Sequence, residues 1–379
     1  MAARAKARHG SGRMKITAIK VYQVDLKIKD APYSWSTFSV DSFDSTIVEI
    51  ETDAGITGIG EVCPHGPSYL PAYAEGARTG IATLGPKLIG LDPRQLGPIN
   101  QVMDHELKGH IYFKSAIDMA CWDILGKATN LPLYTLLGGL QQEKVKLYKV
   151  VSRDTPEKMA AVLRDYQEAG YTHFQVKVGD NAAKDIERIR RVAQDLIPGN
   201  YLAADANTSW KQHEAMRVAA AISDLPVYLE QPCPTYEECV AVRQHCNNPY
   251  ILDEVIDSLS VLMRGYQDKA MDVVNLKIGR FGGLTKARMI RDLCTQLGIA
   301  MTIEDTWGSE ITTAAIAHLS MSTSKGYHHQ SCPFQLYHTN STADGAPTIE
   351  GGMMWASDRP GLGVTPKYDV LGDPVMVIA

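Results

Sequence analysis

The chain has 379 residues, of which 45% are hydrophobic and 21% charged, with a formal net charge of −5. These values are ordinary for a globular protein, and the length allows two domains with a large buried core. The absence of a basic stripe argues against nucleic-acid binding, and no apolar run approaches the roughly 18 to 20 residues that span a bilayer. Seven cysteines without a C-x-x-C pair favour a reducing, cytoplasmic location over a disulfide framework or a thiolate zinc site.

The N-terminal part of the chain divides into a tail and a small domain. Residues 1–13 carry basic side chains, no acidic ones and no hydrophobic periodicity, so we interpret them as a disordered extension or tag, with a transit-like segment as the alternative. Alternating apolar residues in 14–26 and 45–62 predict strands. An apolar face at helical spacing after Ser115 predicts a helix. We therefore expect an α+β capping domain over residues 14–140.

The central part of the chain repeats a charged residue at nearly even spacing, each at or near the end of a short apolar run. These residues are Lys177, Asp205, Glu230, Asp253, Lys277 and Asp305. Their spacing matches one strand plus one returning helix, so it predicts a (β/α)8 barrel over residues 141–345, followed by a segment 346–379 that packs back on the capping domain. The eight expected strands are 146–151, 174–178, 201–205, 227–231, 250–254, 272–277, 300–305 and 327–330.

Three acidic residues end neighbouring strands of this expected barrel: Asp205, Glu230 and Asp253. The carboxyl ends of barrel strands meet at one mouth, where active sites lie. Three clustered carboxylates without a cation would cost on the order of several kcal/mol in repulsion and desolvation. Hard oxygen ligands favour Mg²⁺, with Asn207 as a supporting donor behind them. The alternative is a set of solvated carboxylates that cap helices.

Two lysines, Lys177 and Lys277, lie across the expected barrel from each other. A lysine near a divalent cation and a second lysine is expected to have a lowered pKa, so that a neutral amine is accessible near neutral pH. Such an amine removes a proton from the carbon next to a carboxylate when a metal stabilises the ene-diolate. A Schiff-base aldolase is the alternative, but it needs only one lysine and no carboxylate triad.

The chain resembles the enolase superfamily and, within it, the muconate-lactonizing-enzyme subgroup. The resemblance runs from Met14 to the end and includes the segments LPLYTLLGG, VKVG, DAN, EQP, LDE and NLKIGRFGGLTKAR. It implies a modified TIM barrel with an N-terminal α+β capping domain and a homo-oligomer of between two and eight subunits. It also implies one Mg²⁺ per subunit on the three carboxylates, with both lysines as acid and base.

Departures from the family pattern narrow the resemblance. Many members carry Lys-x-Lys on the second strand, whereas this chain has Gln175 in the first of those positions, free to contact the substrate carboxylate or hydroxyl. The mandelate-racemase branch has a histidine on the seventh strand, where this chain has Asp305. The eighth strand lacks the Asp-x-Asp pair with which dipeptide epimerases hold an amine.

Four segments, GPSYLPAY, FQVKVG, ADANTSW and TIEDTWG, are most similar to enzymes that act on proline derivatives. These enzymes are cis-3-hydroxy-L-proline dehydratases and the 2-epimerases of hydroxyproline betaine or proline betaine. The resemblance implies that Asp305 pairs with the ring ammonium of the substrate. It also implies that Tyr69, Trp307 and Trp35 contact the substrate through apolar or cation–π surface. Ordinary core packing is the alternative for the three aromatic residues.

The expected substrate is a small amino-acid-type carboxylate, and the expected chemistry is removal of its Cα proton by a lysine. A hydroxyl on C3 would then leave as water, and the enamine would tautomerise to Δ1-pyrroline-2-carboxylate. Without a leaving group, the opposite lysine would return a proton and epimerise the substrate. Phe334 and its neighbours lack the tryptophan expected of a betaine cage, which favours dehydration. A 2-epimerase or racemase of proline, hydroxyproline or proline betaines is the alternative, and a non-catalytic barrel is a third hypothesis.

Overall fold

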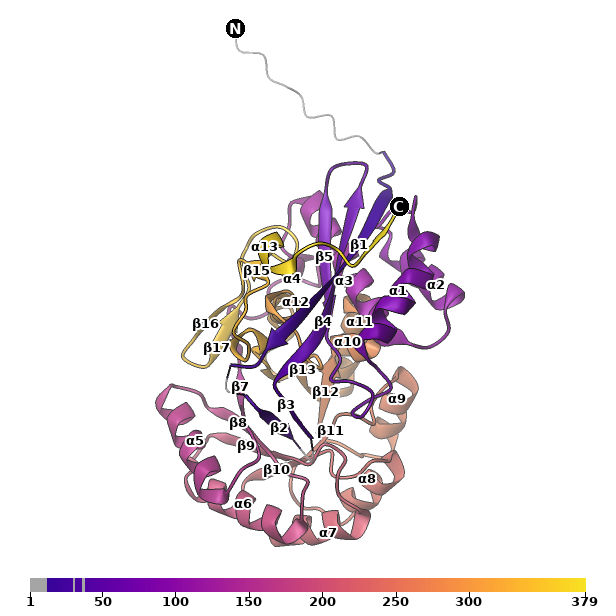
Figure 1. The fold of residues 1–379 in the computed structure, drawn as a ribbon. Helices are drawn as coiled ribbons and strands as arrows, with labels where there is room; N and C mark the ends of the chain where they lie inside the picture. Colours follow the sequence, from indigo (N-terminus) through magenta and orange to yellow (C-terminus); the bar gives the residue numbers. More distant parts are fainter. Residues whose placement is uncertain (1–11, 30, 36–37) are drawn as a thin grey trace.

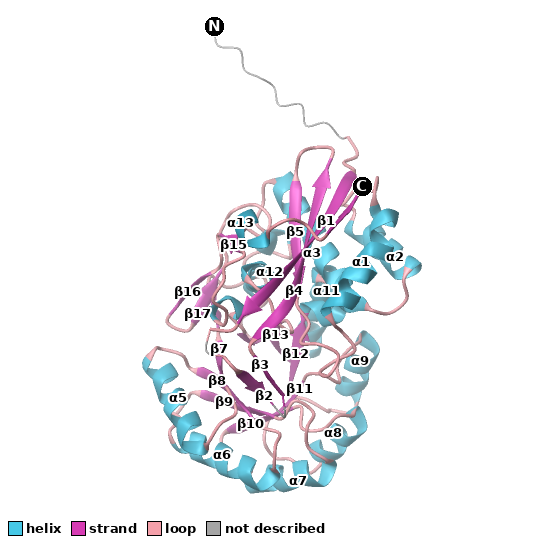
Figure 2. Ribbon diagram, in the orientation of Figure 1, coloured by secondary structure: helices cyan, strands magenta, loops and turns pink. Residues whose placement is uncertain are grey.

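The structure is a computed structural model that describes residues 12–29, 31–35 and 38–379. The expected N-terminal extension therefore lies almost wholly outside the described residues. The described chain forms a four-stranded antiparallel sheet beside an eight-stranded parallel barrel (Figures 1 and 2). This is the predicted fold class. No helix among the described residues is long and apolar enough to cross a membrane.

The antiparallel sheet belongs to the N-terminal part of the chain and has the strand order β19-β1-β4-β5. Buried and exposed residues alternate along much of β1, as expected for a sheet with one face covered by helices. Its strands are β1 (Ile16–Lys27), β4 (Ser42–Thr52), β5 (Thr57–Val62) and the C-terminal β19 (Met376–Ile378), and its helices are α1 (Ala74–Leu88), α2 (Leu96–Glu106) and α3 (Ile111–Thr129). The last strand thus returns from the far end of the chain to pair with β1.

The barrel strands run parallel in sequence order, and a bridge between Leu147 and Ser331 joins the last strand to the residue before the first. They are β7 (Tyr148–Val151), β8 (His173–Lys177), β9 (Tyr201–Asp205), β10 (Val227–Glu230), β11 (Tyr250–Leu252), β12 (Val273–Lys277), β13 (Ala300–Glu304) and β14 (His328–Ser331). The returning helices are α5 (Pro156–Glu168), α6 (Ala182–Gln194), α7 (Gln212–Ala221), α8 (Tyr236–Arg243), α9 (Leu259–Gln267), α10 (Ile278–Phe281), α11 (Leu284–Leu297) and α12 (Glu310–Met321). Helices α5 to α9 form an outer arc around the barrel (Figure 1).

The remaining elements are short: β2 (Tyr33–Trp35), β3 (Phe38–Val40), α4 (Leu133–Leu136), β6 (Val145–Lys146), η1 (Phe334–Leu336), β15 (Ala343–Asp344), β16 (Thr348–Glu350), β17 (Met353–Trp355), β18 (Thr365–Pro366) and α13 (Tyr368–Leu371). One strand prediction was wrong. The expected strand 146–151 is split, because β6 pairs with β17 outside the barrel and only β7 joins the barrel sheet. The strand end expected at 254 also comes two residues early, so Asp253 follows β11 rather than lying in it.

Buried carboxylates fasten the antiparallel sheet and its helices to the barrel. Glu61 at the end of β5 accepts hydrogen bonds from the backbone N–H and hydroxyl groups of Ser309 and Thr312, at 2.7–3.0 Å, at the N-terminus of α12. Asp118 of α3 accepts from the backbone N–H and hydroxyl of Thr285, near the start of α11. Carboxylates favour helix N-termini because they satisfy free N–H groups and complement the helix dipole. These contacts fix the sheet's loops above one end of the barrel.

Candidate active site

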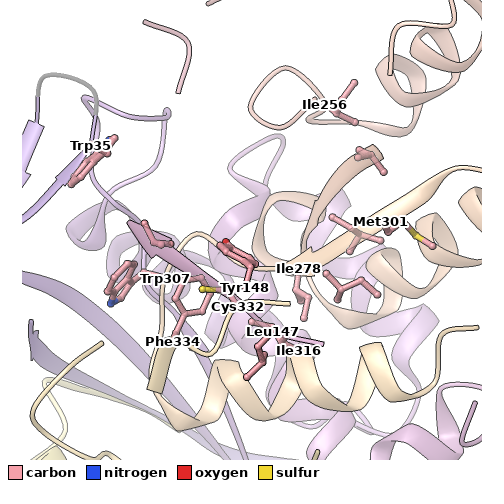
Figure 3. Close-up of a cluster of buried hydrophobic side chains, with 14 of the residues drawn as sticks. Trp35, Leu147, Tyr148, Ile256, Ile278, Met301, Trp307, Ile316, Cys332 and Phe334 are labelled. Carbon is pink, nitrogen blue, oxygen red and sulfur yellow. The ribbon is translucent and has the colours of Figure 1, made fainter. Parts of the chain in front are cut away.

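The mouth of the barrel is covered by loops from the N-terminal part of the chain. Tyr33 and Trp35 of β2, and Tyr69 from the loop after β5, line one cavity together with residues at the barrel strand ends. Trp307 and Phe334 form part of its wall, and their rings lie 5.3 Å apart (Figure 3). The narrow core of this cavity measures about 30 Å³, and a neighbouring cavity of about 330 Å³ shares part of its lining. Both parts of the fold thus contribute side chains to one site.

The three predicted metal ligands come together at this mouth, and each is almost fully buried. Asp205 and Glu230 are the last residues of β9 and β10, and Asp253 directly follows β11. Burial and the neighbouring charge of Asp205 raise the pKa of Glu230 well above its usual range, and Asp253 acts in the same direction. The three carboxylates are therefore close enough to repel one another, as the sequence predicted.

Other side chains offset this repulsion. Glu230 accepts hydrogen bonds from Gln175 Nε2 at 2.9 and 3.0 Å and from Asn275 Nδ2 at 2.6 Å. Asp253 contacts Arg280 Nη1 at 2.6 Å. Burial tends to raise the pKa of Asp253, but the positive charges beside it outweigh burial and lower that pKa. Sequence reasoning did not identify Asn275 or Arg280 as site residues, although they lie two and three residues from Lys277.

Lys177 and Lys277 both reach this mouth, each paired with a different carboxylate. Lys177 Nζ lies 2.6 Å from Asp205 Oδ2, and Lys277 Nζ lies 2.9 Å from Asp253 Oδ2. Burial lowers the pKa of each lysine, but the attraction of the paired carboxylate outweighs burial, so both pKa values are raised. The predicted lowering of the lysine pKa values is therefore not seen in this arrangement. The reason is that each lysine amine forms an ion pair with a carboxylate that is expected to bind the metal.

The donor set fits a hard cation. Among the described residues, no group of three His, Cys, Asp or Glu side chains has metal-binding geometry as it stands, and lysines hold two of the three carboxylates. Buried oxygens of Asn207 and Glu254 nevertheless lack a hydrogen-bond partner. Asn207 donates its backbone N–H to Asp205 Oδ1 at 2.8 Å and its amide to Glu254 Oε1 at 2.9 Å, as expected of a supporting residue. Carboxylate and amide oxygens without sulfur ligands suit Mg²⁺.

Glu304 and Tyr148 are site residues that sequence reasoning missed. Glu304 ends β13, accepts a short hydrogen bond from the Tyr148 hydroxyl, and lies 3.6 Å from Lys277 Nζ. Burial raises the pKa of Glu304. It pairs in register with Lys277 across β12 and β13, so counting strand positions from Lys277 would have identified it.

Asp305, the residue chosen from the sequence, lies one position past that strand and also faces the site. Its two oxygens accept backbone hydrogen bonds from Gly279 at 2.9 Å and Thr306 at 2.7 Å. Burial raises the pKa of Asp305 to about 6. A Cβ on Gly279 would lie 2.8 Å from the Asp305 carboxylate, so the close approach of this backbone requires glycine.

The predicted aromatic residues all line the cavity. Tyr69 contributes its hydroxyl 3.2 Å from Lys277 Nζ. Trp307 packs against Phe43 with ring centroids 4.6 Å apart and against Tyr33 at 5.2 Å. The indole N–H groups of Trp35 and Trp307 have no hydrogen-bond partner among the described residues. These aromatic side chains therefore both pack in the core and line the site.

Comparison with known proteins agrees with this architecture. The family model of the mandelate racemase/muconate lactonizing enzyme N-terminal domain matches residues 17–138, and the enolase C-terminal domain-like model matches residues 158–370. A cis-3-hydroxy-L-proline dehydratase from Roseibium aggregatum is 54% identical over 96% of this chain and 99% of its own. An N-succinyl-L-Arg/Lys racemase from Bacillus cereus is 31% identical over 82% of this chain and 85% of its own.

Solved structures show the same likeness. A mandelate racemase/muconate lactonizing enzyme from Roseovarius nubinhibens has a TM-score of 0.94 and 40% identity, over 97% of this chain and 99% of its own. An enolase-superfamily member from the same organism, complexed with magnesium, has a TM-score of 0.91 and 38% identity, over 96% and 99%. These matches extend over both parts of the fold. The chain belongs to the enolase superfamily, as a member of the mandelate racemase/muconate lactonizing enzyme family.

Proposed function

We propose that this protein is a hydro-lyase that converts cis-3-hydroxy-L-proline to Δ1-pyrroline-2-carboxylate and water. The observation that carries the proposal is the placement of Lys177 and Lys277 on opposite walls of the barrel mouth. They end β8 and β12, which lie four strands apart in an eight-stranded barrel. The 54% identity to the Roseibium dehydratase over nearly the whole chain supports this choice of substrate.

The substrate's stereochemistry requires two groups on opposite faces. In cis-3-hydroxy-L-proline the hydroxyl lies on the carboxylate's side of the ring, so the Cα hydrogen and the hydroxyl point to opposite faces. One lysine, no longer paired once its carboxylate serves as a metal ligand, would act as a neutral amine and remove the Cα proton. The other, as an ammonium, protonates the hydroxyl, and the C3–O bond breaks to release water. The resulting enamine loses a proton from nitrogen and takes one up at C3, which gives the cyclic imine.

Asp205, Glu230 and Asp253 would hold Mg²⁺ in this scheme. When bound, the metal supplies positive charge that stabilises the negative charge developing on the substrate carboxylate. Gln175 donates its amide N–H₂ to Glu230, and its carbonyl oxygen has no hydrogen-bond partner among the described residues. An acceptor suits a substrate hydroxyl better than a carboxylate. Asp305 is the proposed partner of the ring ammonium.

The wider organisation rests on the same resemblance. We propose residues 14–140 as the capping domain, 141–345 as the catalytic barrel and 346–379 as the segment that packs back on the cap. We also propose that the subunits form a homo-oligomer of two to eight copies in the cytoplasm. Size-exclusion chromatography with light scattering would test the assembly, and a monomer at micromolar concentration would contradict it.

Proton NMR of cis-3-hydroxy-L-proline with enzyme and Mg²⁺ in D₂O tests the activity. We expect loss of the C3 carbinol signal together with formation of the pyrroline. Exchange at Cα with the hydroxyl retained would instead indicate a 2-epimerase. No change in either signal would contradict both activities with this substrate. A Lys177→Ala/Lys277→Ala double variant that stays active would overturn the mechanism.

A further inference from the structure

His65 lies where the loop after β5 meets the barrel mouth. It lines both the narrow cavity that holds the lysines and the neighbouring cavity of about 330 Å³. Its ring stacks on Phe43, with centroids 4.5 Å apart and an interplanar angle of 17°, and contacts Tyr69 and Trp35 at 5.0 Å. Aromatic packing on three sides therefore holds the orientation of this imidazole.

Both ring nitrogens of His65 are buried, and neither makes a hydrogen bond of normal geometry to a described residue. The backbone of Thr306 lies close enough to act on the ring N–H, so the nitrogen that carries the lone pair has no donor. Burial, together with the positive charges of Lys277 and Lys177, lowers the pKa of His65 well below its usual range. The ring is therefore neutral, with one N–H donor and one lone-pair acceptor. A buried polar group without a partner needs an explanation, and a ligand that completes its hydrogen bonding is one.

The substrate's amine supplies the matching group. The ring nitrogen of an amino acid such as proline is a secondary ammonium and carries two N–H donors. Asp305 lines both cavities with His65 and can accept one of them. Other unpaired acceptors, Gln175 Oε1, Asn207 Oδ1 and Glu254 Oε2, belong to side chains that form hydrogen bonds with one another or with Glu230 around the expected metal site. His65 remains as an unpaired acceptor that lines both cavities together with Asp305.

We propose that the neutral imidazole of His65 accepts the second N–H of the substrate's ring ammonium and thereby selects secondary amines over N-methylated ones. This inference rests on the proposed function, because it assumes a proline-type substrate. With Asp305 and His65 each taking one N–H, both donors are satisfied inside the site. An N-methyl derivative has one N–H and leaves an acceptor unpaired, and a betaine leaves both unpaired.

Binding of non-reacting ligands tests the inference separately from turnover. We would measure the affinities of L-proline and N-methyl-L-proline by calorimetry with Mg²⁺ for wild type, His65→Phe and His65→Gln. Phenylalanine keeps an aromatic ring that can stack on Phe43 and is no smaller than imidazole, so exclusion of the methyl group by bulk is not relieved. We expect His65→Phe to reduce the preference for L-proline by about 10- to 100-fold, which corresponds to a hydrogen bond from a charged donor. His65→Gln returns an acceptor and should recover part of the preference.

Two results would overturn the inference. One is an unchanged preference for L-proline in His65→Phe. The other is a variant that binds L-proline normally but cis-3-hydroxy-L-proline weakly, since His65 would then contact the hydroxyl. His105→Gln, at a side chain that is 81% exposed, is the matched control and should leave every affinity unchanged. Failure of wild type to dehydrate cis-3-hydroxy-L-proline by NMR would refute the proposed function but not the amine preference.

Discussion

The two ends of the barrel both bury titratable side chains, but they treat charge in opposite ways. At the mouth, Lys177 and Lys277 each pair with a carboxylate at 2.6–2.9 Å, and these partners raise the pKa of both lysines. At the base, His173 and His329 pack with Tyr201 and Tyr228, with ring centroids 4.4–5.7 Å apart. Burial, the largest cause, lowers the pKa of His173 to about 3 and of His329 to about 4, so both imidazoles are neutral near pH 7.

This contrast separates function from stability within one barrel. Active sites of such barrels lie at the carboxyl ends of the strands, and the opposite end contributes mainly to stability. The mouth keeps charges that a cation and a substrate can rearrange. At the base, packed aromatic and imidazole rings fill the lumen, and they offer no charged groups that a ligand could rearrange. Substitutions at the mouth should therefore change activity, whereas those at the base should change stability and its pH dependence.

The largest expected effect comes from replacing a lysine by arginine at the mouth. Arginine keeps the positive charge beside Asp205 but does not release a proton near neutral pH. We expect Lys177→Arg to lower kcat by about 10²- to 10⁴-fold, the usual contribution of acid–base catalysis, with the fold intact. Steady-state kinetics and circular dichroism would measure the two quantities. A variant within tenfold of wild type would show that Lys177 acts only through its charge.

The next largest effect comes from removing a carboxylate. Asp253→Ala leaves Lys277 and Arg280 buried without their main partner, which costs about 3–5 kcal/mol of unfolding free energy. The same change should weaken Mg²⁺ binding by more than tenfold, because a proposed ligand is lost. Denaturant unfolding and magnesium titration by calorimetry would measure these effects. Mg²⁺ affinity equal to that of wild type would remove Asp253 from the ligand set.

A smaller effect is expected from Asp305, whose pKa is raised to about 6 by burial. If Asp305 pairs with the ring ammonium, it must be ionised, so KM should fall as the pH rises through about 6. Asp305→Asn should abolish this pH dependence and raise KM by about 10- to 100-fold, as expected on losing a charged hydrogen bond. A pH profile of KM that is identical in the variant and wild type would exclude this role.

The sequence predicted the barrel and most of the residues at its mouth because charged residues at the strand ends recur at the length of one strand plus one returning helix. Parallel strands end at one edge, so Asp205, Glu230 and Asp253 had to meet. The direction of the lysine pKa shifts was not predictable, because it depends on which carboxylate each amine pairs with. His65 lies in a loop without periodicity, and its place above the mouth follows from how the sheet docks on the barrel. Glu304 was missed because the end of its strand was placed one residue too late.

The smallest predicted effect concerns the base of the barrel. His173 has a folded-state pKa of about 3 against about 6.5 when unfolded. Between these pH values the unfolded chain binds the extra proton, so stability falls as the pH falls through that window. His173→Phe keeps the stacking on Tyr201 and removes this loss. On going from pH 7 to pH 5, the unfolding free energy of His173→Phe should therefore fall by about 1–2 kcal/mol less than that of wild type.

Urea unfolding of His173→Phe and wild type at pH 5 and pH 7, with kcat measured at pH 7, would test this assignment. We expect a shallower loss of stability on acidification and an unchanged kcat, because the substituted ring lies at the end of β8 opposite Lys177. A parallel loss in both proteins would mean that His173 titrates normally. A large fall in kcat with the fold retained would mean that the base also supports catalysis, and the division between the two ends would not hold.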